Sequence, residues 1–291
     1  MKPNAFEVIV KPENKARSYL RRFCWHNRHV FCAHCRSHKT CRIRGRKYRC
    51  RRCGYTFHDF SNRWINEVKV SYKTWLWILK LFELEVSAKE IAQQVGISYP
   101  TALKAVNVIR ASIVAATPEA DELLKSEVEP DESCSGGRRQ GTRRRRAPNK
   151  VPVFGILETK GMVKVSVVKD VTAESLLGMT VNMARRGPIV YTDKLQGYDA
   201  LMFCGDGRLR MGNGKVFSPW KVRANGLERF WGYAEQRLAR SRIVSKEKLP
   251  LYLKEIEFRY NNKSESIFGL LAQNLCGLVP RGVASSSRHG S

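Results

Sequence analysis

The spacing of apolar residues divides the chain into segments of different predicted structure. Residues 23–60 show little periodicity and are rich in Cys, His and Arg, which is typical of a small metal-stabilised module. Residues 61–116 follow a helical period, with amphipathic runs at 72–86, 87–96 and 98–115. From about residue 128, short apolar runs alternate with helical runs, so this part is predicted to be α/β.

The α/β part is predicted to contain a strand, a hairpin, a helix, a further strand and two helices. The strands are expected at 128–133, 151–158, 162–169 and 189–192, with the hairpin turn at 159–161. The helices are expected at 172–186, 224–240 and 247–260.

Changes in composition set the expected domain boundaries. Residues 1–60 are predicted to form a basic lead-in, with one short helix, and the metal module. Residues 61–117 form a helical domain, and 118–276 form the α/β domain. The run Leu278-Val279-Pro280-Arg281-Gly282 is typical of a protease site followed by a tag, so residues 277–291 are expected to have no part in function.

The second and third helical runs have the signals of a helix-turn-helix. Ser87 and Glu90 form a capping box, Gly96 ends the first helix and Ser98 caps the next. This layout can place the second helix in a major groove of DNA. The residues expected to point outward to bases or phosphates are Tyr99, Thr101, Lys104 and Asn107. The alternative is a helical hairpin used for packing or dimerisation.

Charge favours a polyanionic partner over a merely soluble basic surface. The chain carries 53 Lys and Arg against 26 Asp and Glu, a net charge of +27. Residues 1–60 hold 16 basic and 3 acidic residues, and 138–150 hold seven basic residues without an acid. Clustered positive charge of this kind indicates nucleic acid. We find no signal peptide, and charges interrupt the apolar run at 72–86, so no membrane span is expected.

The nine cysteines, without a secretion signal, indicate metal ligation rather than disulfides. Two CxxC knuckles, separated by 14 residues, supply four thiolates for a structural zinc ion: Cys32, Cys35, Cys50 and Cys53. Cys41, His34 and His38 are alternative ligands with less regular spacing. The basic residues of this zinc ribbon are expected to contact DNA phosphates: Arg42, Arg44, Arg46, Lys47, Arg49, Arg51 and Arg52.

Three acidic residues occupy places that suit metal-dependent phosphoryl transfer. Asp131 follows a predicted strand, Asp193 ends another, and Glu228 lies early in a predicted helix, with 34 residues between Asp193 and Glu228. Two strand-end carboxylates and one helix carboxylate can converge on two divalent cations. A lone Asp at a strand end is usually a turn or cap residue, and Glu228 alone would be a solvated helix residue in most proteins.

Four strings in this part form a recognisable set: Val128-Glu129-Pro130-Asp131-Glu132-Ser133, Tyr191-Thr192-Asp193, Asn225-Gly226-Leu227-Glu228-Arg229-Phe230-Trp231, and Tyr252-Leu253 with Glu257-Phe258-Arg259-Tyr260-Asn261. Together they resemble the motifs of Merlin-related bacterial insertion-sequence transposases, the ISXO-two-like DDE group. The resemblance covers roughly residues 23–275. It implies a zinc ribbon, a helix-turn-helix and an RNase H-like core in a bacterial, cytoplasmic, nucleoid-associated enzyme.

The resemblance also implies that Asp131, Asp193 and Glu228 bind two Mg²⁺ (or Mn²⁺) ions, with Asn225 near or at the metal site. The chain departs from the family pattern at Glu235 and Arg223, where the family has a basic residue and a histidine, and Arg237 lies nearby. Arg223 and Arg237 are therefore candidate DNA contacts. Asn225 or Glu235 stays open as an alternative to Glu228. The basic run Arg143, Arg144, Arg145 and Arg146 is either a DNA-gripping loop or a solvated one.

From these features we expect a DNA transposase that binds transposon terminal inverted repeats and catalyses Mg²⁺-dependent strand cleavage and 3′-OH strand transfer. Its partners are double-stranded DNA, as transposon ends and target, and a second copy of the chain in a homodimer on DNA. Two alternatives remain: a sequence-specific DNA-binding regulator with an inactive core, and a non-transposing RNase H-like nuclease.

Overall fold

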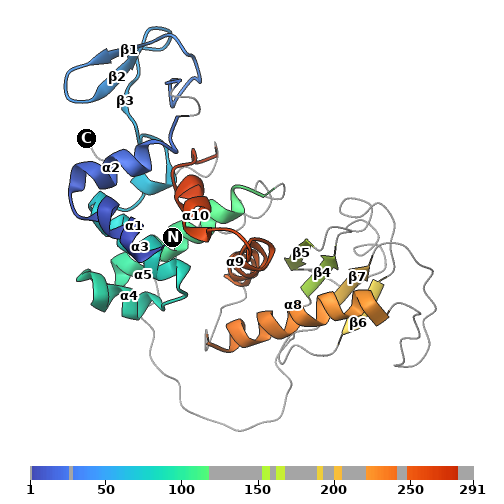
Figure 1. The fold of residues 1–291 in the computed structure, drawn as a ribbon. Coiled ribbons are helices and arrows are strands. Elements are labelled where there is room, and N and C mark those ends of the chain that lie inside the picture. The colour runs from blue at the N-terminus through green and yellow to red at the C-terminus, as the bar shows by residue number, and fades with distance from the viewer. Residues whose placement is uncertain are drawn as a thin grey trace, which may run out of the picture. The chain divides into compact units, whose positions relative to one another are not determined.

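The computed structural model describes residues 2–25, 29–117, 153–157, 162–167, 189–192, 200–204, 221–240 and 248–280, in some of these ranges through the backbone alone. The chain forms two compact units (Figure 1). The first unit comprises residues 1–128 and 262–291, and the second comprises 129–261. The predicted strand at 128–133 and the predicted helix at 172–186 lie outside the described residues.

The first unit contains a small antiparallel sheet in the order β1-β2-β3, formed by β1 (Thr40–Ile43), β2 (Lys47–Cys50) and β3 (Thr56–His58). The turn between β1 and β2 puts Gly45 at φ 75° and Arg46 at φ 58°. The left-handed conformation is unstrained for glycine and lets the chain reverse tightly. On the inner face of the sheet, Tyr48 lies opposite Phe57, and their stacked rings have centroids 5.5 Å apart.

The other elements described in the first unit are helices. They are α1 (Pro3–Val10), α2 (Glu13–Arg21), the 3-10 helix η2 (Trp64–Asn66), α3 (Tyr72–Glu83), α4 (Ala88–Val95), α5 (Tyr99–Val114) and α10 (Ile267–Leu275). The lead-in thus holds two helices where the sequence predicted one short one. Leu20, Trp75, Leu79 and Ile109 are almost completely buried and form part of the core.

The helix-turn-helix layout predicted from the sequence is present in the structure. The Ser87 side chain accepts a hydrogen bond from Glu90 N, and the Glu90 carboxylate accepts one from Ser87 N, which completes the capping box. Gly96 ends α4 at φ 73°, and Ser98 caps α5 by accepting from Thr101 N. Ile91 of α4 is fully buried, so the amphipathic pattern has placed the inner faces of α4 and α5 against each other.

Helix α10 belongs to the first unit, although the α/β domain predicted from the sequence, residues 118–276, includes it. Phe268 is fully buried, with ring centroids 5.8 Å from Phe6 and 5.9 Å from Tyr19. Its backbone N–H donates to the carboxylate of Glu83 at 3.2 Å. The following residues, which the sequence interpretation set aside, continue this contact: Trp64 N donates to Gly277 O, and Val279 N donates to Asn62 O. The first unit is therefore built from two distant parts of the chain.

A buried carboxylate joins the ribbon to the helices. Asp59, which follows β3 and is 2% exposed, accepts hydrogen bonds from four side chains: Arg17 Nη2 at 2.6 Å, Arg21 Nε at 3.0 Å, Trp25 Nε1 at 2.8 Å and Tyr48 Oη at 3.4 Å. Burial alone would raise the pKa of Asp59, but the bonds from Trp25 and Arg21 and the charges of Arg21 and Arg17 lower it below its usual value. The carboxylate therefore stays ionised in the interior.

Arg63 extends this link to the other end of the chain. It is 3% exposed and donates to three backbone carbonyls: Asp59 O at 2.8 Å, Cys276 O at 2.6 Å and Cys24 O. Its guanidinium also lies 4.6 Å from the centre of the Trp25 ring. Burial lowers the pKa of Arg63. Arg63 thus holds together the end of α2, the segment after β3 and the end of α10.

The second unit contains a four-stranded sheet in the order β5-β4-β7-β6. Its strands are β4 (Val153–Leu157), β5 (Val163–Val167), β6 (Ile189–Thr192) and β7 (Ala200–Cys204). Strand β4 runs antiparallel to β5 and parallel to β7, and β6 is antiparallel to β7. The helices are α8 (Lys221–Arg240) and α9 (Leu249–Asn261). The predicted hairpin, the strand at 189–192 and both helices are confirmed; β7 was missed.

Replacing Asp59 with Asn should lower the free energy of unfolding of the first unit by about 2 kcal/mol at neutral pH, because it removes the charge from a buried acceptor of several hydrogen bonds. The folded pKa is lowered, so the stabilisation is complete above the unfolded pKa and disappears as pH falls. The difference between the parent and Asp59→Asn should begin to shrink as the pH falls below about 4, the ordinary pKa of an aspartate, and should vanish only below the lowered pKa of the folded state.

The measurement is chemical unfolding followed by tryptophan fluorescence at several pH values. The control is Glu7→Gln, because the Glu7–Lys11 pair is exposed and should contribute nothing measurable. Equal stability of the parent and Asp59→Asn at pH 7 would contradict the role given to this carboxylate.

Candidate zinc site and nucleic-acid interface

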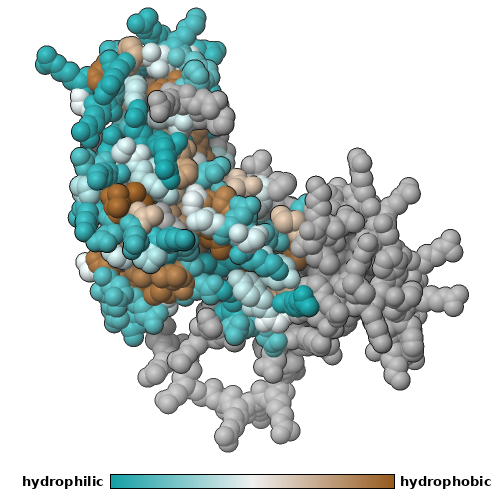
Figure 2. All heavy atoms as spheres, in the orientation of Figure 1, coloured by the Kyte–Doolittle hydropathy of each residue, from teal (hydrophilic) through white to brown (hydrophobic). Residues whose placement is uncertain are grey.

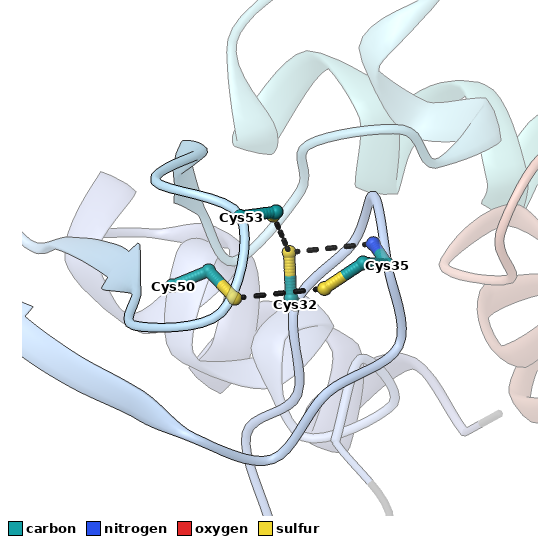
Figure 3. Close-up of side chains that lie close together, drawn as sticks. All are labelled: Cys32, Cys35, Cys50 and Cys53. Atoms are coloured by element: carbon teal, nitrogen blue, oxygen red, sulfur yellow. Dashed lines mark hydrogen bonds between the residues drawn. The ribbon is translucent and has the colours of Figure 1, made fainter.

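The four cysteines predicted to bind zinc meet at one point of the ribbon. Cys32 and Cys35 come from the turn before β1, Cys50 ends β2, and Cys53 lies on the turn that follows. Their sulfur atoms all lie within 4.8 Å of one another, and Figure 3 shows the four side chains pointing toward a common centre. Each CxxC turn therefore contributes two ligands, as the spacing predicted.

The distances between the sulfurs fit a tetrahedral ion. Cys32 Sγ lies 3.6 Å from Cys53 Sγ, and Cys35 Sγ lies 3.6 Å from Cys50 Sγ. Four sulfurs bound at about 2.3 Å to a central zinc would lie about 3.8 Å apart. Backbone N–H groups support the cluster: Cys35 N donates to Cys32 Sγ, and Arg52 N donates to Cys50 Sγ. The site therefore fits a structural zinc ion.

The pKa values of the cysteine thiols also favour a bound divalent cation. Burial would raise the pKa of Cys50, but hydrogen bonds from the backbone of Cys53 and Arg52 and from neighbouring thiols lower it to about 7. The pKa of Cys53 rises to about 12: the backbone N–H of Tyr55 lowers it, and burial and the other thiols outweigh that effect. Ionising one thiol thus makes ionising the next unfavourable, and a divalent cation at the centre removes this conflict.

The alternative ligands lie elsewhere. Cys41 Sγ donates to Arg49 O at 3.6 Å, His34 packs beside the Tyr55 ring at 5.5 Å, and the ring of His38 lies 5.9 Å from Phe31. Within the described part of the chain, the four-cysteine cluster is the only group of three or more Cys, His, Asp or Glu that could hold a metal.

The basic residues predicted to contact phosphates are exposed on the ribbon. They are Arg42, Arg44, Arg46, Lys47, Arg49, Arg51 and Arg52. On the face seen in Figure 2, the ribbon end of the first unit is predominantly hydrophilic. Arg44 and Arg46 lie in the turn between β1 and β2, and both are exposed.

Strand register separates two faces of the ribbon sheet. Arg49 lies opposite Thr56 and Cys41, and Lys47 lies opposite Ile43 and His58. Directly opposed residues share a face, and successive residues alternate. Lys47 and Arg49 therefore lie on the face that does not carry Tyr48 and Phe57. This outer face combines two exposed cations with Ile43, which is 38% exposed.

The four residues predicted on the outer side of α5 differ in availability. Tyr99 is 51% exposed and Lys104 is exposed, so both can reach a ligand. Thr101 is half-buried, and its hydroxyl lies 2.8 Å from that of Ser98. Asn107 is half-buried and accepts from Arg110 Nη1 at 3.4 Å. Tyr99 and Lys104 are therefore the better-placed pair.

The predicted catalytic residues are described only in part. Asp131, Asp193 and the basic run Arg143–Arg146 lie outside the described residues. Arg223, Asn225 and Glu228 lie in α8, where the backbone is described and their side chains are not. Arg237, farther along α8, lies over the Tyr233 ring at 4.5 Å.

Sequence reasoning missed several residues that organise the two units. Asp59 and Arg63 of the first unit are buried charges, as are Lys254, Glu257 and Arg259 of α9. Each lies in a segment where a charged residue is normally expected to be exposed, so its burial could not be read from the sequence pattern. Only α9 offered a clue, because Glu257 and Arg259 belong to the string that carries the family resemblance.

No helix in the described part of the chain is both long and apolar enough to cross a membrane.

Comparison with known proteins agrees with these features. Residues 11–56 match the transposase zinc-ribbon domain, and residues 123–261 match the ISXO2-like transposase domain. An uncharacterized transposase-like protein of Haemophilus influenzae is 32% identical over 119 residues, which are 40% of this chain and 97% of that protein. No solved structure matches the chain. The chain belongs to the ISXO2-like transposase family, whose domain implies a phosphoryl-transfer enzyme that acts on DNA.

The family match and the fold agree on one boundary. The ISXO2-like match ends at residue 261, which is also where the second unit ends. It spans Asp131, Asp193 and Glu228 as well as all the described strands of the second unit. Helix α10 lies beyond both matched domains.

Replacing Cys35 with Ser should abolish zinc binding, because a closed four-sulfur site leaves no spare ligand. The purified parent should hold one zinc per chain, measured by mass spectrometry of the metal. Cys41→Ser is the matched control and should keep the full amount, since its thiol bonds to a strand carbonyl. Zinc loss in the Cys41 variant alone would overturn the assigned ligand set.

Proposed function

We propose that this chain is a DNA transposase that binds the terminal inverted repeats of its element, cuts a strand at each end and joins the freed 3′-OH to target DNA. The observation that supports the proposal is the ISXO2-like match over 123–261, a span that includes Asp131, Asp193 and Glu228. Three carboxylates that converge on two divalent cations could carry out metal-dependent phosphoryl transfer. We also propose that these three residues complete an RNase H-like core.

Three carboxylates offer hard oxygen donors, which suit Mg²⁺ or Mn²⁺. Bound there, two such ions would activate a water or 3′-hydroxyl and stabilise the leaving oxygen. In this proposal Asp131 and Asp193 hold the ions from strand ends and Glu228 holds them from α8, with Asn225 one helical turn before it. Arg223, Arg237 and the run Arg143–Arg146 would hold the charged DNA backbone near the site.

The first unit supplies the proposed DNA-binding surface. Seven exposed basic residues lie on the zinc ribbon, and Tyr99 and Lys104 are accessible at the start of α5. Basic residues contact phosphates and set position, whereas a helix in the major groove reads sequence. We assign recognition of the terminal repeat to α5 and general DNA affinity to the ribbon.

Two ends must be cut and joined together, so we propose that the active form on DNA is a homodimer. Each protomer would then bind one end through its own first unit.

Incubation with DNA carrying the element's ends and Mg²⁺ should produce nicks with 3′-OH termini, and then joined products with a second DNA. Asp131→Asn, Asp193→Asn and Glu228→Gln should each reduce cleavage at least about 100-fold, because each removes a ligand of the ions that stabilise the transition state. DNA binding should persist in all three.

Glu235→Gln serves as the matched control for Glu228→Gln and should cut like the parent. The 3′ and 5′ ends are mapped on sequencing gels with Mg²⁺ or EDTA. Cleavage without joining would identify a nuclease. Specific binding without any cleavage in the parent would identify a regulator and exclude the transposase.

Lys104→Ala should weaken binding to end DNA and reduce the slope of log affinity against log salt by about 1, as expected for one lost phosphate contact. Binding is measured by fluorescence anisotropy at several salt concentrations. Lys11→Ala, which removes an exposed lysine paired with Glu7 on α1, should leave the slope unchanged. Identical slopes for the parent and Lys104→Ala would remove α5 from the proposed interface.

A further inference from the structure

Two side chains of α9 hydrogen-bond the backbone of strand β5. Val163 N donates to Asn261 Oδ1 at 2.8 Å, and Asn261 Nδ2 donates to Val163 O at 2.7 Å. Val165 N donates to Glu257 Oε2 at 2.8 Å. Asn261 therefore satisfies both backbone groups of one residue, in the way that a neighbouring strand would. We call this contact between α9 and β5 the edge clamp.

The edge clamp follows from matched spacings. Glu257 and Asn261 are four residues apart, a rise of about 6 Å along a helix. Val163 and Val165 are two residues apart, about 6.7 Å along a strand, and both direct their backbone groups away from β4. Strand β5 is at the end of the described sheet order, so these groups are on its outer edge. The match fixes where α9 lies along the strand.

Burial makes the edge clamp costly to break. Glu257 is 8% exposed, and its Oε2 also accepts from Lys254 Nζ at 2.9 Å, with Lys254 only 2% exposed. A buried ion pair stabilises little by itself, but losing one partner leaves an unsatisfied charge in the interior. The carboxylate, the ammonium and the strand N–H therefore form one arrangement with little freedom to shift.

The same end of α9 holds α8. The ring of Tyr260, between the two clamp positions, packs edge-to-face on Phe230 with centroids 5.1 Å apart and lies 5.8 Å from Tyr233. Phe230 is fully buried. Helix α8 is continuous from Lys221 to Arg240, so the position of Phe230 determines that of the backbone two residues earlier, at Glu228.

We propose that Glu257 and Asn261 are positioning residues for the metal-binding glutamate: they register α9 on the edge of β5, and α9 in turn sets the place of α8 and of Glu228. This inference rests on the proposed function, because it gives Glu228 a metal. It also assigns a role to the string Glu257-Phe258-Arg259-Tyr260-Asn261, which carries the family resemblance and to which no role is otherwise assigned.

The test is Mn²⁺ binding to the full-length, zinc-loaded protein without DNA, measured by electron paramagnetic resonance. Asn261→Leu keeps the size of the side chain and removes both strand bonds. It should weaken Mn²⁺ affinity about 10-fold, the low end of the effect of removing groups that orient metal ligands. Glu257→Gln keeps an oxygen acceptor for Val165 N but removes the carboxylate that pairs with buried Lys254, so it should lower the melting temperature while its Mn²⁺ affinity stays nearer to that of the parent. Glu257→Leu should weaken Mn²⁺ binding as Asn261→Leu does.

Two controls separate positioning from general stability. Gln236→Leu makes the same amide-to-leucine change at an exposed site on α8 and should leave Mn²⁺ affinity unchanged. All variants are compared well below their melting temperatures. If Asn261→Leu and Glu257→Leu lower only the melting temperature and bind Mn²⁺ like the parent, the positioning role is wrong.

Failure of the proposed function has a different signature. In that case the parent would either not bind Mn²⁺ or would bind it equally well after Glu228→Gln and Asp193→Asn. Parent binding that depends on these acids, together with normal binding by the clamp variants, rejects only the inference about Glu257 and Asn261.

Discussion

The first unit depends on a carboxylate that stays charged inside the protein. Asp59 is almost fully buried, and it remains ionised because two guanidinium groups and an indole N–H donate to it. These donors come from the N-terminal helical region, whereas Asp59 follows the ribbon. Breaking the contact would leave a buried charge without partners, which is far less favourable than never burying it. The ribbon and the helices therefore have one stable arrangement within the unit.

The ribbon itself has two sources of order. Its sheet is three short strands with a single inner layer of aromatic rings, too little apolar surface to hold a fold alone. The four-cysteine cluster ties its two turns together at one end, and Asp59 holds the other end against the helices. A metal that closes the loops and a carboxylate that anchors them stabilise different parts of the same small sheet. This leaves the basic residues on its surface free of a packing role.

Local patterns in the sequence predicted the features that local chemistry controls. The sequence marked where α4 begins and ends, at Ser87 and Gly96, and where α5 begins, at Ser98. These ends are predictable because capping depends on residues only a few positions apart. The CxxC spacing predicted the metal ligands for the same reason. Asp131, Asp193 and Glu228 were predicted from their places at expected strand ends and in an expected helix, and from the family resemblance.

What the sequence could not predict depends on partners far away in the chain. Strand β7 was missed because Ala200–Cys204 is a continuous apolar run, whose periodicity does not distinguish a strand from a helix segment. Its pairing with β4 and β6 defines it. Asp59, Arg63 and Asn261 look like ordinary surface residues until their distant partners are known. Charged and amide side chains acquire structural roles only through such contacts, which periodicity does not encode.

The position of α10 has a consequence for how the protein is made. The core of the first unit includes Phe268, Leu271 and Leu275, so it cannot close when residue 117 leaves the ribosome. At about 5–20 residues per second, the missing helix follows roughly 8 to 30 s later. The second unit, which ends at Asn261, is synthesised in full before that moment. A nascent chain therefore cannot complete the first unit before the second has been translated.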